Sequence, residues 1–143
     1  MTVTEFLDRA DIHLHFKAAS VVEAIPELLQ PALARRIANP QVVKDIVDAA
    51  VRREEETSTM CGVVSLPHAR SADIDRFIVT LGVHDDGRPR LIFAFVSPDA
   101  KREQHLQLLA SLAKISQNPT VVDSIAAASS ADQVIDVMHK AGM

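Results

Sequence analysis

The sequence contains few aromatic side chains and a single cysteine. Trp and Tyr are absent, and aromatic residues make up 3% of the 143 residues, whereas hydrophobic residues make up 48%. The core must therefore be built from aliphatic side chains, and the scarcity of rings argues against a surface that stacks on bases or sugars. Cys61 has no second cysteine to pair with, which excludes an intrachain disulfide and fits a reducing compartment.

Long runs of positive charge and of apolar residues are also missing. No Lys/Arg run exceeds two residues and the formal net charge is −4, so neither nucleic acid nor an anionic membrane surface is expected as a partner. No apolar run approaches the length of about 18 residues that spans a membrane, and the first residues carry acid without the apolar segment of a secretory signal. We therefore expect a cytoplasmic protein without stable membrane insertion, folded as one domain over residues 1–143.

Periodicity along the chain predicts both strands and helices. Residues 11–16 alternate apolar and polar, which predicts a strand with Ile12, Leu14 and Phe16 on one face. Apolar, β-branched composition predicts further strands at 61–66, 77–81 and 90–96, the last two joined by a hairpin turn at 84–87. Capping residues and helical spacing predict helices over about 20–38, 40–55, 97–112, 118–126 and 130–140.

The order of these elements predicts the fold class. A strand, helices, three strands and helices again indicate an α/β (α+β) domain with a single mixed sheet of about four or five strands flanked by helices. We expect the first helix to be kinked or broken at Pro26 and Pro31, because each interior proline removes a hydrogen bond. The 90–96 strand is apolar nearly throughout, which is typical of a central strand covered on both faces.

His68 follows the apolar segment 61–66 and comes directly after Pro67. Proline donates no ladder hydrogen bond and biases Leu66 toward extended geometry, so the strand is expected to end here, with residues 69–73 as a loop and the imidazole presented to solvent. Because imidazole titrates close to neutrality, an accessible ring nitrogen can act as a nucleophile, a base or a ligand. The alternative is a turn histidine that is satisfied by a nearby carbonyl and has no function.

A metal site is a separate alternative for the histidines. His13 and His15 are expected on the outward face of the first strand, and either one would have to join His68 and His105. No acidic or thiol partner has ligand spacing, so we expect neither a metal nor another cofactor.

Three features together are similar to a known family: Arg52, the segment Val-Val-Ser-Leu-Pro-His68-Ala, and the segment Glu-Gln-His105-Leu-Gln-Leu-Leu-Ala. In this spacing they resemble the enzyme IIA domain of the mannitol/fructose class in the bacterial phosphoenolpyruvate:sugar phosphotransferase system. That family includes the stand-alone nitrogen-branch regulators, and the resemblance covers nearly the whole chain. Arg53 is adjacent to Arg52, and a shift of one residue in the correspondence would exchange the two.

The resemblance implies a phosphotransferase component with a phosphohistidine intermediate. His68 would accept a phosphoryl group from a histidine phosphocarrier protein and pass it to a sugar-transporter IIB component, or use it as a signal to a regulatory target protein. Arg52 and His105 would be catalytic, offering a guanidinium fork and a ring N–H to the phosphate oxygens. Thr57 and Ser58, which match a Ser-Thr pair of the family, would add phosphate-binding hydroxyls.

The chain departs from the family in the segment before the central strand. The family usually has a Ser-Thr-Gly-Ile-Gly-x-Gly pattern, whereas this chain has Thr57-Ser-Thr-Met-Cys-Gly62-Val and keeps one glycine. Glycines in that segment let backbone N–H groups approach a phosphate closely. Their loss motivates a second hypothesis, a regulatory binding module that keeps the IIA fold and works without phosphate.

Overall fold

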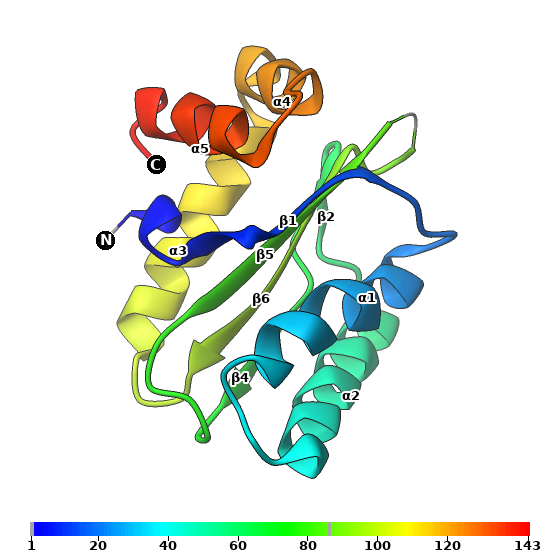
Figure 1. Ribbon diagram of the computed structural model, residues 1–143, viewed down its shortest axis with the longest axis vertical. Helices are drawn as coiled ribbons and strands as arrows, with labels where there is room; N and C mark the ends of the chain where they lie inside the picture. The colour runs from blue at the N-terminus through cyan, green and yellow to red at the C-terminus, as the bar shows by residue number, and fades with distance from the viewer. Residues whose placement is uncertain (1, 86) are drawn as a thin grey trace.

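A six-stranded sheet with helices on both faces makes up the computed structural model, which describes residues 2–85 and 87–143 (Figure 1). The strands are β1 (Leu7–Phe16), β2 (Met60–Cys61), β3 (Val64–Ser65), β4 (His68–Ser71), β5 (Ile78–His84) and β6 (Leu91–Pro98). A 3-10 turn, η1 (Val3–Glu5), precedes them, and the helices are α1 (Val21–Ala34), α2 (Pro40–Glu56), α3 (Arg102–Ser116), α4 (Pro119–Ala126) and α5 (Ala131–Lys140).

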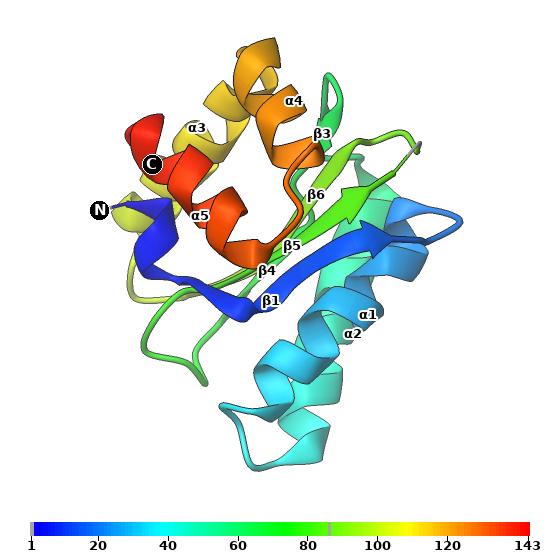
Figure 2. The ribbon, with the colours of Figure 1, turned by 45° about the horizontal axis from the view of Figure 1, so that its top comes forward.

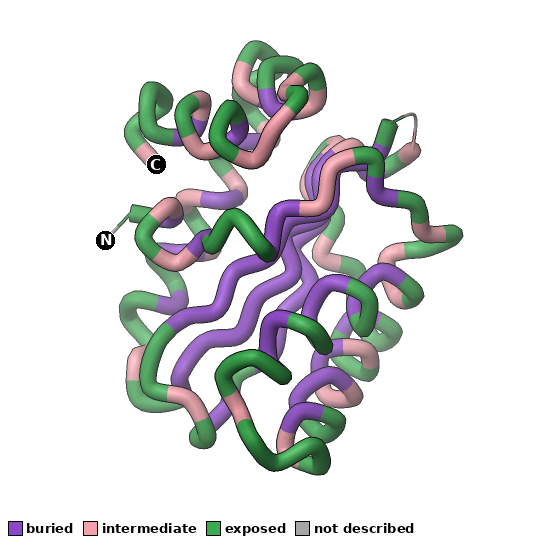
Figure 3. Tube along the Cα trace, viewed as in Figure 1, coloured by how far each residue is buried: buried purple, intermediate pink, exposed green. Residues whose placement is uncertain are grey.

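The sheet is mixed, as the sequence predicts. Its order is β1-β5-β6-β3-β2, and β4 also pairs with β6. β5 and β6 form the antiparallel pair at its centre, whereas β1 runs parallel to β5, and β3 and β4 run parallel to β6. Every residue of β6 is buried, which confirms the predicted central strand (Figure 3). The strands are more numerous than expected because the segment before His68 forms two short strands and His68 itself begins another.

Two apolar cores lie on opposite faces of the sheet. α1 and α2 cover one face, and α3, α4 and α5 cover the other (Figures 1 and 2). The capping residues predicted from the sequence act as expected, since Ser20, Asn39 and Ser130 each accept a hydrogen bond from a backbone N–H in the first turn of α1, α2 and α5. Within the described ranges, no helix combines the length and the apolar character that crossing a membrane requires.

α1 continues through both of its prolines as one helix, so the predicted break does not occur. Pro26 and Pro31 lie on the exposed face, where water can satisfy the carbonyl groups that lose their N–H partners. The opposite face buries six apolar side chains, Ala24, Ile25, Leu28, Leu29, Ala32 and Leu33. Burial of this face outweighs the two missing backbone hydrogen bonds.

β1 is longer and less regular than the predicted strand. His15 has a φ of 54°, and the pairing of β1 with β5 shifts register between His13 and Phe16. Such an irregularity reverses the alternation of side chains. Ile12 therefore packs into the core on the α3–α5 face and Phe16 into the core on the α1–α2 face, so the prediction that both share one face is wrong.

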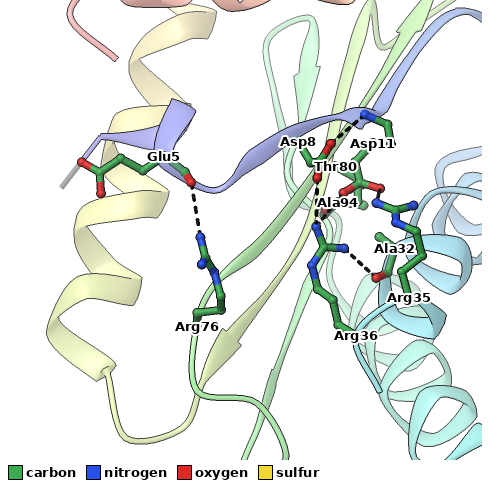
Figure 4. Close-up of polar contacts among 10 residues, drawn as sticks. Glu5, Asp8, Asp11, Ala32, Arg35, Arg36, Arg76, Thr80 and Ala94 are labelled. Carbon is green, nitrogen blue, oxygen red and sulfur yellow. Dashed lines mark hydrogen bonds and ion pairs between the residues drawn. The ribbon is translucent and has the colours of Figure 1, made fainter. Parts of the chain in front are cut away.

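A buried carboxylate connects β1 to the end of α1 (Figure 4). Asp11 is 1% exposed, and its two oxygens accept hydrogen bonds from Arg35 at 2.6 Å and from Arg36 at 3.3 Å. Arg36 also donates to the carbonyl of Ala32 at 2.7 Å. Both carboxylate oxygens are thereby satisfied, which fixes the position of α1 relative to the edge of the sheet.

Candidate functional site

His68 is the first residue of β4. The preceding strand ends at Ser65, before Leu66 and Pro67, as predicted, but residues 69–71 continue β4 and do not form the predicted loop. β4 pairs with β6 so that His68 lies opposite Phe95. Pro67 lacks a donor but keeps its acceptor, and its carbonyl accepts a hydrogen bond from the Phe95 N–H at 3.1 Å. Pro67 therefore donates no hydrogen bond to the sheet, but its carbonyl still bonds to β6.

The His68 ring is buried and not presented to solvent. It is 4% exposed, because it stacks on Phe95 at a ring distance of 4.9 Å and α2 lies against β4. The ring nevertheless lines an open surface pocket of about 420 Å³, together with Arg53, Arg70 and Arg102. His68 is thus at the floor of a hollow whose surrounding charge is positive, and no Asp or Glu is found among the described residues that line it.

Hydrogen bonds assign the roles of the two His68 nitrogens. Nδ1 lies 2.8 Å from the carbonyl oxygen of Leu66, and because a carbonyl only accepts, Nδ1 carries the proton. Nε2 accepts a hydrogen bond from the Nε of Arg53 at 3.1 Å, so Nε2 carries the lone pair. Burial lowers the pKa of His68, and the charge of Arg53 acts in the same direction, whereas the bond to Leu66 opposes them. The ring is therefore neutral at pH 7, with Nε2 unprotonated.

His105 lies beside His68 on the first turns of α3. The two rings are 5.2 Å apart and inclined by 58°, and His105 is buried. Its Nδ1 is 2.6 Å from the Oγ of the buried Ser97 at the end of β6. Burial, together with the neighbouring His68, Arg70 and Arg53, lowers the pKa of His105 to about 4, so this ring is also neutral at pH 7. His105 was predicted from the sequence, whereas Ser97 was not.

Arg53, and not Arg52, contacts His68. Both residues lie in α2, and each residue of a helix is rotated by about 100° from the one before it. The rotation that directs Arg53 toward β4 leaves Arg52 outside the lining of the pocket. The arginine beside His68 is thus Arg53, one position after the residue that the resemblance implied.

Thr57 and Ser58 do not line the pocket. Thr57 is the C-cap of α2 and Ser58 accepts a hydrogen bond from the N–H of Met60, and both are exposed. The hydroxyl that connects with the site belongs to Thr59, whose Oγ1 accepts from the Leu66 N–H at 3.2 Å. The hydroxyl connected with the site thus lies directly after the expected pair Thr57 and Ser58.

Thr59 in turn binds Glu54, a buried residue of α2 that was not among the residues predicted for the site. Glu54 is 7% exposed, and its carboxylate accepts from the hydroxyl of Thr59 at 2.8 Å. A signal was available, because Glu54 follows the buried residues Val47 and Ala50 at helical spacing and so shares their face. Arg70 and Arg102 were missed because residues far apart in sequence meet only in the folded chain.

The alternative metal site is not assembled. In residues 2–85 and 87–143, no three His, Cys, Asp or Glu side chains gather where they could hold a metal ion. His13 and His15 belong to β1, which β5 and β6 separate from β4. The histidine pair at the site therefore lacks a third ligand from that strand.

Comparison with known proteins identifies relatives in transport and in regulation. The chain is 27% identical over 126 residues to the mannitol-specific EIICBA component of Klebsiella pneumoniae, a match that covers 75% of this chain and 19% of that protein. It is 28% identical over 102 residues to the fructose-specific EIIA component of Haloferax volcanii, covering 64% of this chain and 66% of that one. The chain thus spans about a fifth of the first relative's length and about two thirds of the second's.

The fold agrees with a solved regulatory protein. The crystal structure of the nitrogen regulatory protein IIA-Ntr from Neisseria meningitidis superposes with a TM-score of 0.80 at 25% identity, over 95% of this chain and 98% of the other. Residues 5–141 match the family described as "Phosphoenolpyruvate-dependent sugar phosphotransferase system, EIIA 2". Because this match covers almost the entire chain, the protein belongs to the EIIA type 2 family of the phosphotransferase system.

Proposed function

We propose that this chain is a cytoplasmic, single-domain phosphoryl carrier in which the Nε2 of His68 accepts a phosphoryl group from a histidine phosphocarrier protein. One observation carries the proposal. The Leu66 carbonyl holds the Nδ1 proton, which leaves the Nε2 lone pair at the floor of a pocket lined by Arg53, Arg70 and Arg102. A neutral nitrogen with a fixed lone pair is a nucleophile, and three guanidinium groups can neutralise the charge of a phosphoryl group.

The transfer step needs no further reagent. The Nε2 lone pair attacks phosphorus, the new N–P bond forms at His68, and the N–P bond to the donor histidine breaks with its electron pair returning to the donor ring. The reaction depends on positioning and on charge stabilisation of the three equatorial oxygens. Arg53 now bonds to Nε2, so its guanidinium must move aside and bind the phosphoryl oxygens as the donor approaches.

His105 would supply a neutral hydrogen-bond donor. A neutral imidazole has one N–H, and a Ser97 hydroxyl that donates to Nδ1 would place that proton on Nε2. The His105 ring lines the same pocket as His68, so its N–H can bind a phosphoryl oxygen there. Ser97 thereby acts through His105 and is a positioning residue.

The relatives support two classes of acceptor. The name of the Klebsiella pneumoniae relative combines the A component with B and C components in one protein, which supports a IIB component as the acceptor of phosphate from His68. The structural relative from Neisseria meningitidis is a nitrogen regulatory protein, which supports a regulatory target protein instead.

The second candidate is a regulatory binding module that keeps the IIA fold and works without phosphate. The sparse glycines of residues 57–63 favour it, because Gly62, with a φ of 62°, is the single glycine of that segment. Side chains at the other positions restrict the approach of a phosphate to the backbone there.

Intact-mass measurement separates the two candidates. The protein is incubated with phosphoenolpyruvate, the general first enzyme of the relay and its histidine phosphocarrier. A phosphoryl carrier gains one acid-labile phosphoryl group, which His68→Ala abolishes and which His139→Ala, an exposed histidine on α5, retains. Label that persists in His68→Ala refutes the site, and no label from any donor favours the binding module.

A further inference from the structure

A chain of hydrogen bonds that starts in α2 ends at the protonated nitrogen of His68. The Glu54 carboxylate accepts from the N–H of Thr59 at 3.1 Å and from its hydroxyl at 2.8 Å. The Thr59 Oγ1 accepts from the Leu66 N–H at 3.2 Å, and the Leu66 carbonyl accepts from the Nδ1 of His68 at 2.8 Å. Four residues from α2, β4 and the segment between them are thereby joined end to end.

The direction of each bond is fixed by its chemistry. A carboxylate can only accept, so the Thr59 hydroxyl donates a hydrogen bond to Glu54 and uses a lone pair to accept from the Leu66 N–H. The N–H and the carbonyl of Leu66 belong to successive peptide groups, so the chain acts by geometry and not by conjugation. Anchoring the N–H of Leu66 limits the rotation of a residue that Pro67 already restricts, and so aims its carbonyl at Nδ1.

Burying the Glu54 carboxylate costs free energy, because the group is removed from water without an ion-pair partner in the described part of the chain. Glu54 is 7% exposed, and among the described residues no Lys, Arg or His forms an ion pair with it. A buried carboxylate that lacks a cationic partner must be stabilised by hydrogen bonds alone, and all those that the structure gives it come from Thr59. An unpaired buried charge one residue from Arg53 indicates a role in the site.

We propose that Glu54 and Thr59 are positioning residues that keep the proton of His68 on Nδ1 and thereby keep Nε2 as the reactive nitrogen. This inference rests on the proposed function, because it concerns how the same ring is prepared for phosphate. Without the anchor at Thr59, the Leu66 carbonyl loses its fixed direction, the proton exchanges between the two nitrogens, and part of the ring population has no lone pair at Nε2.

The test uses Thr59→Val and Glu54→Gln, with Thr57→Val and Glu55→Gln as matched controls on exposed neighbours. Side-chain ¹⁵N spectra of the free protein report which nitrogen of His68 carries the proton, and single-turnover kinetics report transfer from the phosphocarrier. Thr59→Val is expected to produce a mixture of tautomers and to slow transfer about tenfold, with a smaller effect for Glu54→Gln, which keeps an acceptor oxygen. Both controls should match the unmodified protein.

The outcomes separate positioning from folding and from the proposed function itself. Thr59→Ser, which keeps the hydroxyl, should restore both the tautomer and the rate even if Thr59→Val unfolds. A single Nδ1–H tautomer with an unchanged transfer rate in a folded Thr59→Val variant would overturn the inference, as would a failure of Thr59→Ser to differ from it. If the unmodified protein takes no phosphate, the proposed function fails, whereas the ¹⁵N spectra still decide the positioning role because they need no donor.

Discussion

The Nε of Arg53 donates a 3.1 Å hydrogen bond to the Nε2 of His68, the nitrogen that carries the ring's lone pair. In the proposed transfer, Arg53 therefore occupies the place that the incoming phosphorus atom would take. Its positive charge also helps to keep the ring unprotonated, since it lowers the pKa of His68. Arg53 thus covers the Nε2 of His68 when no phosphate is bound, and it is the cation nearest to the phosphoryl group that would bind there.

Replacing Arg53 should slow phosphoryl transfer far more than replacing its neighbour Arg52. Arg53→Ala is expected to slow phosphoryl transfer to His68 by about a hundredfold, because it removes a charged donor from the transition state. Arg53→Lys should recover only part of the rate, since an ammonium lacks the planar fork. Arg52→Ala, the matched control, should stay within about twofold. Single-turnover kinetics make the comparison, and the reverse ranking of the two alanine variants would contradict the geometry.

Ser97 and His105 should behave as a coupled pair. Ser97→Ala removes the hydrogen bond to Nδ1 and leaves that buried nitrogen without its partner, which should lower the free energy of unfolding by about 1–2 kcal/mol. It should also slow transfer, because the N–H of His105 is no longer held on Nε2. Transfer rates of the two single variants and the double variant Ser97→Ala/His105→Ala form a cycle. Additive effects would show that Ser97 does not act through His105.

Stability should fall as the pH falls from 6.5 to about 4. The pKa of His105 is about 4 in the folded protein against an ordinary value of 6.5, so in this range the unfolded chain binds more protons than the folded one. The depressed pKa of His68 adds to the slope in the same direction. Urea unfolding across this range measures the slope, and His105→Gln should flatten it. An unchanged slope in His105→Gln would contradict the assignment.

Replacing Asp11 should lower the free energy of unfolding without changing the rate of phosphoryl transfer. Asp11→Ala removes the acceptor of two arginines and is expected to cost about 2 kcal/mol in the free energy of unfolding. The change lies at β1, away from the pocket of His68, so the rate of phosphoryl transfer should remain within about twofold at temperatures where the variant is folded. Asp8→Ala, an exposed neighbour, is the control and should change stability by less than about 0.5 kcal/mol.

Local sequence signals predict the helices and the central strands well. Ser20, Asn39 and Ser130 cap helices because their side-chain oxygens satisfy N–H groups close by in the chain. The apolar run of 90–96 is a central strand because a strand covered on both faces needs no polar side. By contrast, the continuity of α1 through Pro26 depends on which face the fold buries, which is a tertiary property.

The structure brings His68 and His105 together at the pocket, whereas Arg52, Thr57 and Ser58 lie outside its lining. Its exact members depend on the rotation of α2 and on the path of the chain between α2 and β4, and an error of one position in either exchanges neighbours. That is how Arg52 was expected where Arg53 lies. The burial of His68 depends on Phe95 and on the packing of α2, which no local pattern encodes.

The most direct test of the proposed function is to identify the nitrogen atom that carries the phosphoryl group. The ¹⁵N-labelled protein is phosphorylated through the phosphocarrier, and ³¹P–¹⁵N couplings locate the phosphorus. We predict a single phosphoryl group on the Nε2 of His68, with Nδ1 still protonated. Phosphorus on Nδ1, on another histidine, or on none of them would contradict it.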